Sequence, residues 1–475
     1  MKKTSDKKRI LRNSIIVTST TIIEKITFIA INISVARYLS VSDYGEYTTA
    51  LGYATFFSFF CGLGIYQSII RMINLDPLNE RQHFGNSVLI RGFLTIIIYA
   101  VLAGSLVFTN YNTNTIHLIL IFGLVRFGNQ LLIGFYSLYD AKEKFITTSL
   151  YYICFSLSFL TITFIIIYLG GNYFHFAFSR LAVVCLFLVS ISITTYINFR
   201  FTIDLSSLKH LLKNTIPFAL HIVYNNIILR VNIIILSLIH GTIYSGIFNN
   251  GYIFLTSLTF IPQNIQRVLV PYLYKEKFID NNDKFQFSFN IFSKFFNIIS
   301  FYIFIILFIF SREIILFIFG QKYEGTVIIL KILAFAIPFL FNAATIIITS
   351  LDRQEYNTRI SAYAAVFNVT LNITLIYFFK AEGAALAAVF TFMFIYTCSH
   401  AILKKKGFIR LFKSTANFVK LIFSVFLCCL AFRYFLYDLH FMVSFLCTSI
   451  LYGILTLVFI INKNDLRIIR EIITR

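Results

Sequence analysis

The sequence contains no tryptophan and few charged residues, and these shortages already restrict the class of protein. Asp, Glu, Lys and Arg make up 13% of the 475 residues, 58% are hydrophobic, and the mean hydropathy is +0.80. Soluble globular domains carry about 25% charged residues. The composition therefore excludes a soluble protein and indicates a polytopic membrane protein, in which Tyr and Phe must supply the aromatic side chains at the membrane interfaces.

Several motifs of catalytic and metal-binding chemistry are also missing. The seven cysteines lie in apolar stretches, form no CxxC pair and have no histidine at ligand spacing, so we interpret them as buried small hydrophobic residues. No GxxxxGK[ST] nucleotide-binding loop occurs. A membrane enzyme would need a sizeable outer loop or paired carboxylates, and neither is evident. We therefore expect that the chain is not an enzyme and has no resident cofactor.

The long apolar segments predict an all-α integral membrane protein. About 14 of them reach the roughly 20 residues that a bilayer-spanning helix needs, and they lack the alternation of barrel strands. The connections are short, which excludes a separate soluble domain. The predicted spans are 14–36, 47–70, 86–108, 115–138, 147–169, 174–198, 214–239, 247–271, 289–311, 327–350, 360–379, 383–402, 415–435 and 439–461.

The basic residues gather in alternate loops and at both ends of the chain. Lys and Arg number 41 against 20 acidic residues, yet the loops 109–115, 170–174 and 240–246 contain neither Lys nor Arg. The positive-inside rule then places both termini in the cytoplasm. Because the positive charge is spread over one side of the membrane, we do not interpret it as a nucleic-acid-binding surface.

A faint internal repeat indicates how the spans are grouped. Residues 12–15 (RNSI) resemble residues 213–216 (KNTI), and further matches recur at an offset near 200. Two halves of the same orientation are a transporter design, with substrate bound between them. The expected parts are a basic cytoplasmic N-terminus (1–13), a six-helix N-lobe (14–200), a six-helix C-lobe (201–405), and two further helices with a cytoplasmic C-terminus (406–475).

Charged and amide side chains occur in the middle of predicted spans, where they are costly and usually face a wet, protein-lined interior. Glu24 and Lys25 lie near the middle of the first span, and Glu24 is the only acidic residue inside any predicted span. The excess of cations predicts a cavity for an anionic cargo. The candidate cavity residues are Lys25, Asn32, Arg126, Gln130, Asn226, Arg230 and Arg267, with Glu24 as the candidate ion-coupling residue.

Structural roles are the alternatives for these residues. Glu24 and Lys25 would then form intramembrane pairs that hold helices together, and Arg267 would extend its side chain to the cytoplasmic surface.

Four segments, in their order and spacing, resemble bacterial polysaccharide repeat-unit flippases of the multidrug/oligosaccharidyl-lipid/polysaccharide exporter superfamily. The resemblance covers about residues 10–405. It implies a two-lobed helical transporter that works by alternating access in the bacterial cytoplasmic (inner) membrane. The segments are ARYLSVSDYGEYTTALGYATFFSFFCGLGIYQSIIR (36–71), RVNIIILSLIHGTIYSGIFNNGYIF with IPQNIQRVLVPYL (230–273), FGQKYEGTVIILKILAFAIPFLFNAATIIITSLDRQEY (319–356) and NVTLNITLIYFFKAEGAALAAVF (368–390).

The cargo implied by the resemblance is a polyprenyl-diphosphate-linked oligosaccharide, moved from the cytoplasmic to the outer leaflet for O-antigen or capsule synthesis. Besides this cargo, the expected partners are membrane lipid and, as an open option, other polysaccharide-assembly membrane proteins. Two alternatives remain: a lipid-linked peptidoglycan-precursor flippase and a cation-coupled multidrug exporter of the same superfamily. The single intramembrane carboxylate leaves coupling to a proton or sodium gradient open.

Overall fold

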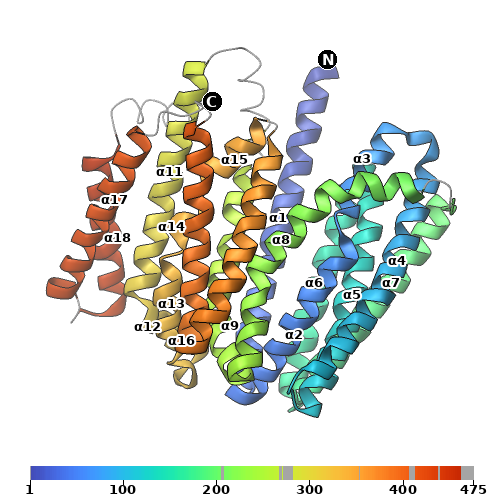
Figure 1. Ribbon diagram of the computed structural model, residues 1–475, viewed down its shortest axis with the longest axis horizontal. Coiled ribbons are helices and arrows are strands. Elements are labelled where there is room, and N and C mark those ends of the chain that lie inside the picture. The colour runs from blue at the N-terminus through green and yellow to red at the C-terminus, as the bar shows by residue number, and fades with distance from the viewer. Residues whose placement is uncertain are drawn as a thin grey trace. The chain divides into compact units, whose positions relative to one another are not determined.

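The described residues are almost entirely helical and contain no strand, which confirms the predicted all-α class (Figure 1). The computed structural model describes residues 2–204, 208–266, 270, 282–351, 353–405, 412–436 and 439–461. Its backbone contacts divide the chain into two compact units, residues 1–249 and 250–475. Each unit is a bundle of helices with its own interior.

The first unit contains eight helices and the start of a ninth. They are joined by short turns, several with a helix-capping side chain such as Ser40 or Asn112, which accepts a hydrogen bond from a free backbone N–H of the first turn. The helices are α1 (Lys2–Tyr38), α2 (Val41–Gly62), α3 (Ile65–Leu75), α4 (Glu80–Ser105), α5 (Thr113–Ala141), α6 (Phe145–Tyr168), α7 (Tyr173–Phe199), α8 (Leu208–His240) and α9 (Thr242–Leu258).

Helix α2 lies in the interior of the first unit, where it packs on α4, α5 and α8. Glycines allow the closest approaches. A Cβ on Gly45 would lie 2.6 Å from the carbonyl oxygen of Thr242, and one on Gly52 would lie 2.9 Å from the side chain of Ile233. Between α2 and α5, Tyr47 packs edge to face on Phe122 with ring centroids 5.2 Å apart. The ring pair joins α2 to α5, and both helices contribute to the site described below.

The second unit contains shorter and more broken helices. Its elements are α11 (Asn282–Ile309), α12 (Ser311–Phe319), α13 (Thr326–Ala334), α14 (Ile337–Leu340), α15 (Ala343–Ser350), α16 (Gln354–Lys405), α17 (Phe412–Ala431), a π-helical turn (Phe432–Leu436) and α18 (Phe441–Phe459). A bend of 45° separates Thr326–Ala334 from Ile337–Ser350, where Pro338 occupies the first turn of the following helix.

Helix α16 is a hairpin of two membrane-crossing segments rather than one rod. A straight 52-residue helix would be about 78 Å long, far more than a bilayer's roughly 30 Å core. The backbone is non-helical at Lys380 (φ 50°, ψ −126°), and Asn368 donates a hydrogen bond to Thr391 at 2.9 Å, which a straight helix would place about 35 Å away. The hairpin matches the predicted spans 360–379 and 383–402.

The predicted number of 14 spans is not confirmed. The described residues contain 11 helices that are long and apolar enough to cross a membrane, or 12 if the bent pair in the second unit forms one span. That count treats the two segments of α16 as a single helix. The predicted span 247–271 falls on α9, which has 17 residues in its described part. The predicted division into two lobes at residue 200 describes an internal duplication. The division at residue 249 is based on contacts and does not test a duplication. The two lobes therefore stay a prediction.

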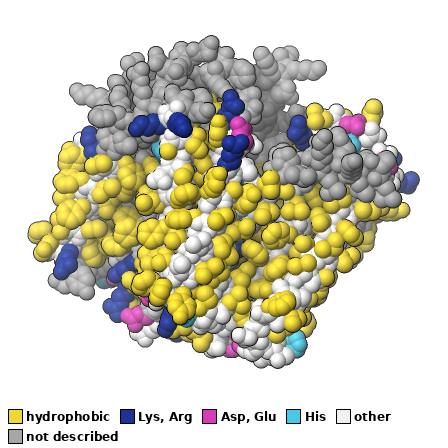
Figure 2. All heavy atoms as spheres, in the orientation of Figure 1, with side chains coloured by type: hydrophobic (Ala, Val, Ile, Leu, Met, Phe, Trp, Pro, Cys, Tyr) yellow, Lys and Arg dark blue, Asp and Glu magenta, His cyan; other side chains and the backbone are white. Residues whose placement is uncertain are grey.

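Hydrophobic side chains cover the outer surface of the helices. In the face shown in Figure 2 they dominate the middle of the helices in each unit, and most of the visible Lys and Arg side chains lie toward helix ends. Phe93 and Ile96 on α4 are 62% and 72% exposed, and Phe378 on α16 is 72% exposed. A soluble protein rarely exposes apolar surface on this scale. The surface is therefore suited to contact with lipid.

The hairpin of α16 depends on the absence of a side chain at Gly383. A Cβ there would lie 2.1 Å from the backbone carbonyl oxygen of Leu375, so the two segments would have to move apart. We expect Gly383→Ala to lower the free energy of unfolding by about 1–3 kcal/mol, as overpacking does. The melting temperature of the detergent-purified protein measures the effect. Gly453→Ala in α18 is the matched control, because nothing lies within 4 Å of its Cβ position; equal melting temperatures for the two variants would contradict the close approach.

Candidate functional site

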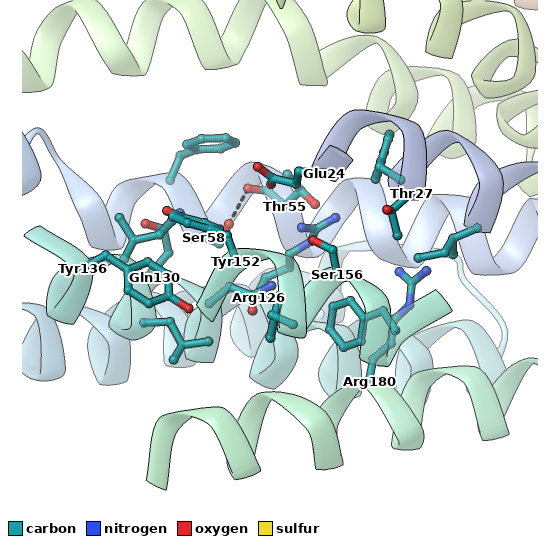
Figure 3. A pocket seen from close by; sticks show the side chains of 18 residues that line it. Glu24, Thr27, Thr55, Ser58, Arg126, Gln130, Tyr136, Tyr152, Ser156 and Arg180 are labelled. Carbon is teal, nitrogen blue, oxygen red and sulfur yellow. Dashed lines mark hydrogen bonds between the residues drawn. The ribbon is translucent and has the colours of Figure 1, made fainter. Parts of the chain in front are cut away.

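A cavity of about 270 Å³ lies within the first unit, among α1, α2, α5, α6 and α7 (Figure 3). Helical periodicity brings the lining residues of α1 and α5 to one face each. Positions 24, 27, 28 and 31 of α1 line the cavity, as do positions 126, 129, 130 and 133 of α5. Both sets follow the i, i+3, i+4, i+7 spacing of a single helix face. Of the residues predicted in the first span, Glu24 thus lies on a wall of this cavity.

Two arginines from different helices line the cavity, Arg126 on α5 and Arg180 on α7. The guanidinium of Arg180 lies 5.5 Å from the ring centre of Tyr47 and 5.6 Å from that of Phe159, which is the geometry of cation–π contacts. The Nε of Arg126 is buried and has no hydrogen-bond partner. Among the residues that the structure describes, neither arginine lies within 4 Å of a carboxylate oxygen.

Like charges surround Arg126. Its electrostatic neighbours include Arg180 and Arg230, both of which repel it, and the phenol of Tyr47. A charge in the interior of a membrane protein is costly to hold without a counter-charge. The cavity therefore has a region of positive potential that an anion would neutralise.

Among the described residues, Glu24 supplies the only carboxylate that lines the cavity. Its side chain is exposed to the cavity and, within the described ranges, makes no hydrogen bond or ion pair. Its electrostatic neighbours are Lys25, Tyr136 and Tyr152. A helix-locking ion pair of Glu24 or Lys25 is thus absent from the described part of the chain.

Tyrosines and amides line the part of the cavity around Gln130. The rings of Tyr136 and Tyr152 lie 4.5 Å apart between centroids. The phenol oxygen of Tyr136 and the amide oxygen of Asn129 are buried without a hydrogen-bond partner. Ser58 donates its hydroxyl proton to the Thr55 carbonyl oxygen at 2.8 Å. This part of the lining therefore combines aromatic rings with amide and hydroxyl groups, as ligand pockets commonly do.

A third arginine is fully buried and contacts the backbone of α5 next to the cavity. Arg91 on α4 is 2% exposed, and its Nη1 donates a hydrogen bond to the backbone carbonyl oxygen of Gln130 at 3.0 Å. Gly134 leaves room for it, because a Cβ there would lie 2.9 Å from the Arg91 side chain. Arg91 does not line the cavity, and it joins α4 to the segment of α5 that carries Gln130.

The structure brings three of the predicted site residues into the cavity: Glu24, Arg126 and Gln130. Four others belong to the same unit but are not among the lining residues: Lys25, Asn32, Asn226 and Arg230. The amides of Asn32 and Asn226 each donate to the carbonyl oxygen four residues earlier in their own helix. Arg267 lies outside the described residues. The functional roles of all these residues remain predictions.

Arg180, Tyr152 and Ser156 also line the cavity, although none of them was among the predicted site residues. Arg180 lies seven residues after the start of α7, where a cation in a sequence is easily interpreted as a residue that reaches to the membrane surface. The sequence contains one indication that Arg180 faces a cavity, since α7 has no acidic residue that could pair with it. Tyr152 and Ser156 gave no signal that distinguishes them from other residues of an apolar span.

Comparison with solved structures defines the class of fold. The structure is similar to that of a lipid II flippase, MurJ, in an inward closed conformation, with a TM-score of 0.76 at 16% sequence identity, over 94% of this chain and 98% of that one. It is also similar to an inward-facing multidrug resistance MATE family transporter of the MOP superfamily, with a TM-score of 0.64 at 14% identity over 83% of this chain and 98% of that one. The chain is thus a multi-pass membrane protein with the flippase and transporter fold of the MOP superfamily.

A third similar structure is that of a MOP superfamily transporter from Pyrococcus furiosus, whose binding pocket is described as having reverse polarity. Its TM-score is 0.57 at 13% identity, over 88% of this chain and 96% of that one.

The family follows from the sequence. Residues 34–328 match the family described as polysaccharide biosynthesis protein, and the chain belongs to this family. A comparison with curated protein sequences finds no match.

Because Arg126 is surrounded by like charges, removing its charge should not weaken the fold. We expect Arg126→Met to leave the melting temperature of the purified protein unchanged or to raise it, since the substitution relieves repulsion and desolvation. Lys142→Met should instead lower the free energy of unfolding by up to about 1 kcal/mol, because Lys142 pairs with Glu80 at 2.7 Å. A marked loss of stability in Arg126→Met would show that Arg126 has a structural role.

Proposed function

We propose that the protein is a flippase that translocates polyprenyl-diphosphate-linked oligosaccharide repeat units from the cytoplasmic to the outer leaflet, for O-antigen or capsule synthesis. The observation that carries the proposal is that Arg126 and Arg180 line one cavity whose described lining residues include a single carboxylate, Glu24. Membership of the polysaccharide biosynthesis protein family agrees with it.

The physical demands of such a cargo agree with the site. A polyprenyl tail can stay in the hydrocarbon, so only the diphosphate and the sugars need a polar route. Guanidinium groups bind phosphate oxygens through paired, charge-assisted hydrogen bonds, which are stronger in a site that excludes water. The amide of Gln130 and the hydroxyls of Ser58 and Ser156 suit sugar hydroxyls.

The charge of the cavity separates this function from one of the two alternatives, and family membership favours it over the other. A multidrug exporter that carries cations should have several carboxylates in its cavity, whereas Arg126 and Arg180 outnumber Glu24 here. A lipid-linked peptidoglycan precursor is also a polyprenyl diphosphate and would suit the same arginines. Between these two lipid-linked cargoes, membership of the polysaccharide biosynthesis family favours the oligosaccharide.

The proposal also includes the orientation of the chain in the membrane and the energy source of transport. We place the chain in the bacterial cytoplasmic membrane with both termini in the cytoplasm, because the basic residues gather in the loops on that side. The cavity would open alternately to the two sides of the membrane. Coupling to a proton or sodium gradient would use Glu24, and flipping in proteoliposomes under an imposed pH or sodium gradient tests that coupling.

The test of the proposal is the amount of lipid-linked oligosaccharide in each leaflet of cells that lack the native protein. A double variant, Arg126→Gln with Arg180→Gln, should lower flipping at least about tenfold, since each lost guanidinium removes charge-assisted hydrogen bonds to the diphosphate. Intermediates would then accumulate in the cytoplasmic leaflet. Arg312→Gln is the matched control, because Arg312 is exposed and pairs with the exposed Glu324 at 3.2 Å.

Normal flipping by the double variant, in a protein made at the normal level, would refute the role of the two arginines. If lipid-linked intermediates do not change when the protein is removed, the cargo is a different molecule.

A further inference from the structure

The cavity has two chemically different ends. In Figure 3, Arg180 and Thr27 lie toward one end, and Tyr136 and Gln130 lie toward the other. The electrostatic neighbours divide in the same way. Arg126 interacts with Arg180, Arg230 and Tyr47, whereas Glu24 interacts with Lys25, Tyr136 and Tyr152. We call the first the arginine end and the second, with Glu24, Gln130, Tyr136 and Tyr152, the tyrosine end.

The tyrosine end is built to hold a polar ring. The rings of Tyr136 and Tyr152 are 4.5 Å apart and tilted by 49°, and both line the cavity. Tyr136 is 2% exposed and its phenol oxygen has no hydrogen-bond partner. A buried polar atom without a partner is unusual in a folded protein and calls for water or a ligand. Aromatic faces with nearby hydroxyl and amide groups are suited to a sugar ring.

The size of the cavity limits what it holds. Its volume of about 270 Å³ lies just below the range of about 300–1,000 Å³ that is usual for ligand sites. By the liquid volume of about 30 Å³ per water molecule, it corresponds to roughly nine waters. A space of this size takes about one sugar ring and part of the diphosphate. The remaining sugars of a repeat unit must extend beyond it.

Glu24 gives the tyrosine end a negative charge that faces the cavity. No cation pairs with it within 4 Å in the described part of the chain. Lys25 is its neighbour in sequence but does not line the cavity, and Arg91 lies behind the wall with a hydrogen bond to the Gln130 backbone. An acidic group placed at this end would meet the carboxylate directly, and like charges in a low-dielectric site repel strongly.

We propose that the tyrosine end binds the sugar next to the diphosphate, and that Glu24 selects against an acidic sugar and for a neutral or amino sugar there. The inference rests on the proposed function, which places the diphosphate at Arg126 and Arg180. Tyr136 and Tyr152 contact the sugar ring, and the ionised carboxylate of Glu24 accepts hydrogen bonds from its hydroxyl or ammonium groups. Selection works by repulsion of the wrong cargo as well as by attraction of the right one.

The experiment compares four probes that share a short prenyl tail: geranyl diphosphate, and geranyl diphosphate linked to glucose, to glucosamine or to glucuronic acid. Their affinities for the full-length purified chain are measured by titration calorimetry at about pH 8. We expect the glucuronic acid probe to bind at least about tenfold more weakly than the glucose probe. Glu24→Gln should bring the two affinities within about twofold of one another. Glu143→Gln, an exposed carboxylate in the turn after α5, should keep the native ratio.

Equal binding of the glucose and glucuronic acid probes by the native chain would overturn the inference, and this comparison does not depend on the folding of any variant. An unchanged ratio in a folded Glu24→Gln protein would overturn it as well. If none of the four probes binds, including geranyl diphosphate, the proposed function itself is wrong. Binding of geranyl diphosphate without discrimination among the sugars would contradict only the further inference.

Discussion

The structure depends on holding positive charge in a membrane-embedded interior without a matching negative charge. Arg126 and Arg180 line one cavity in which Glu24 is the only carboxylate among the described lining residues, and Arg126 is also repelled by Arg230. Such an arrangement costs stability, because charges in a low-dielectric interior are poorly solvated and like charges repel. Sites that bind and move a charged cargo often carry this cost. The surrounding helices must therefore be held rigidly enough to prevent the arginines from separating.

The packing of the first unit supplies this rigidity. Gly45 and Gly52 bring α2 close to α8 and α9, and Arg91 ties α4 to α5 through the Gln130 backbone. Arg180 is held between the rings of Tyr47 and Phe159. A guanidinium that is positioned by aromatic rings keeps its N–H donors available, whereas an ion pair would occupy them. The cavity is thus preorganised for an anion by contacts that do not neutralise its charge.

Sequence predicted the fold class and part of the site, for reasons that particular residues illustrate. Glu24 was predicted from its charge in the middle of a span, and helical periodicity places it on the face of α1 that lines the cavity. Asn32 was predicted to line the cavity, but its amide N–H donates a hydrogen bond to a carbonyl oxygen of its own helix. The sequence does not show whether an amide makes such a local hydrogen bond. Arg180 and Tyr152 were not among the predicted site residues, because their place depends on how α6 and α7 pack. At Lys380 the chain folds back between the two predicted spans 360–379 and 383–402, so here the apolar segments of the sequence did show the hairpin.

The most direct test of the central claim is an experimental structure of the full-length chain in a lipid nanodisc with geranyl diphosphate bound. The account predicts density for the two phosphates between the guanidinium groups of Arg126 and Arg180, within hydrogen-bonding distance of both. Phosphate density elsewhere, with these two arginines paired to carboxylates of the protein, would contradict it. That result would make the arginines structural and leave the cavity without its proposed ligand.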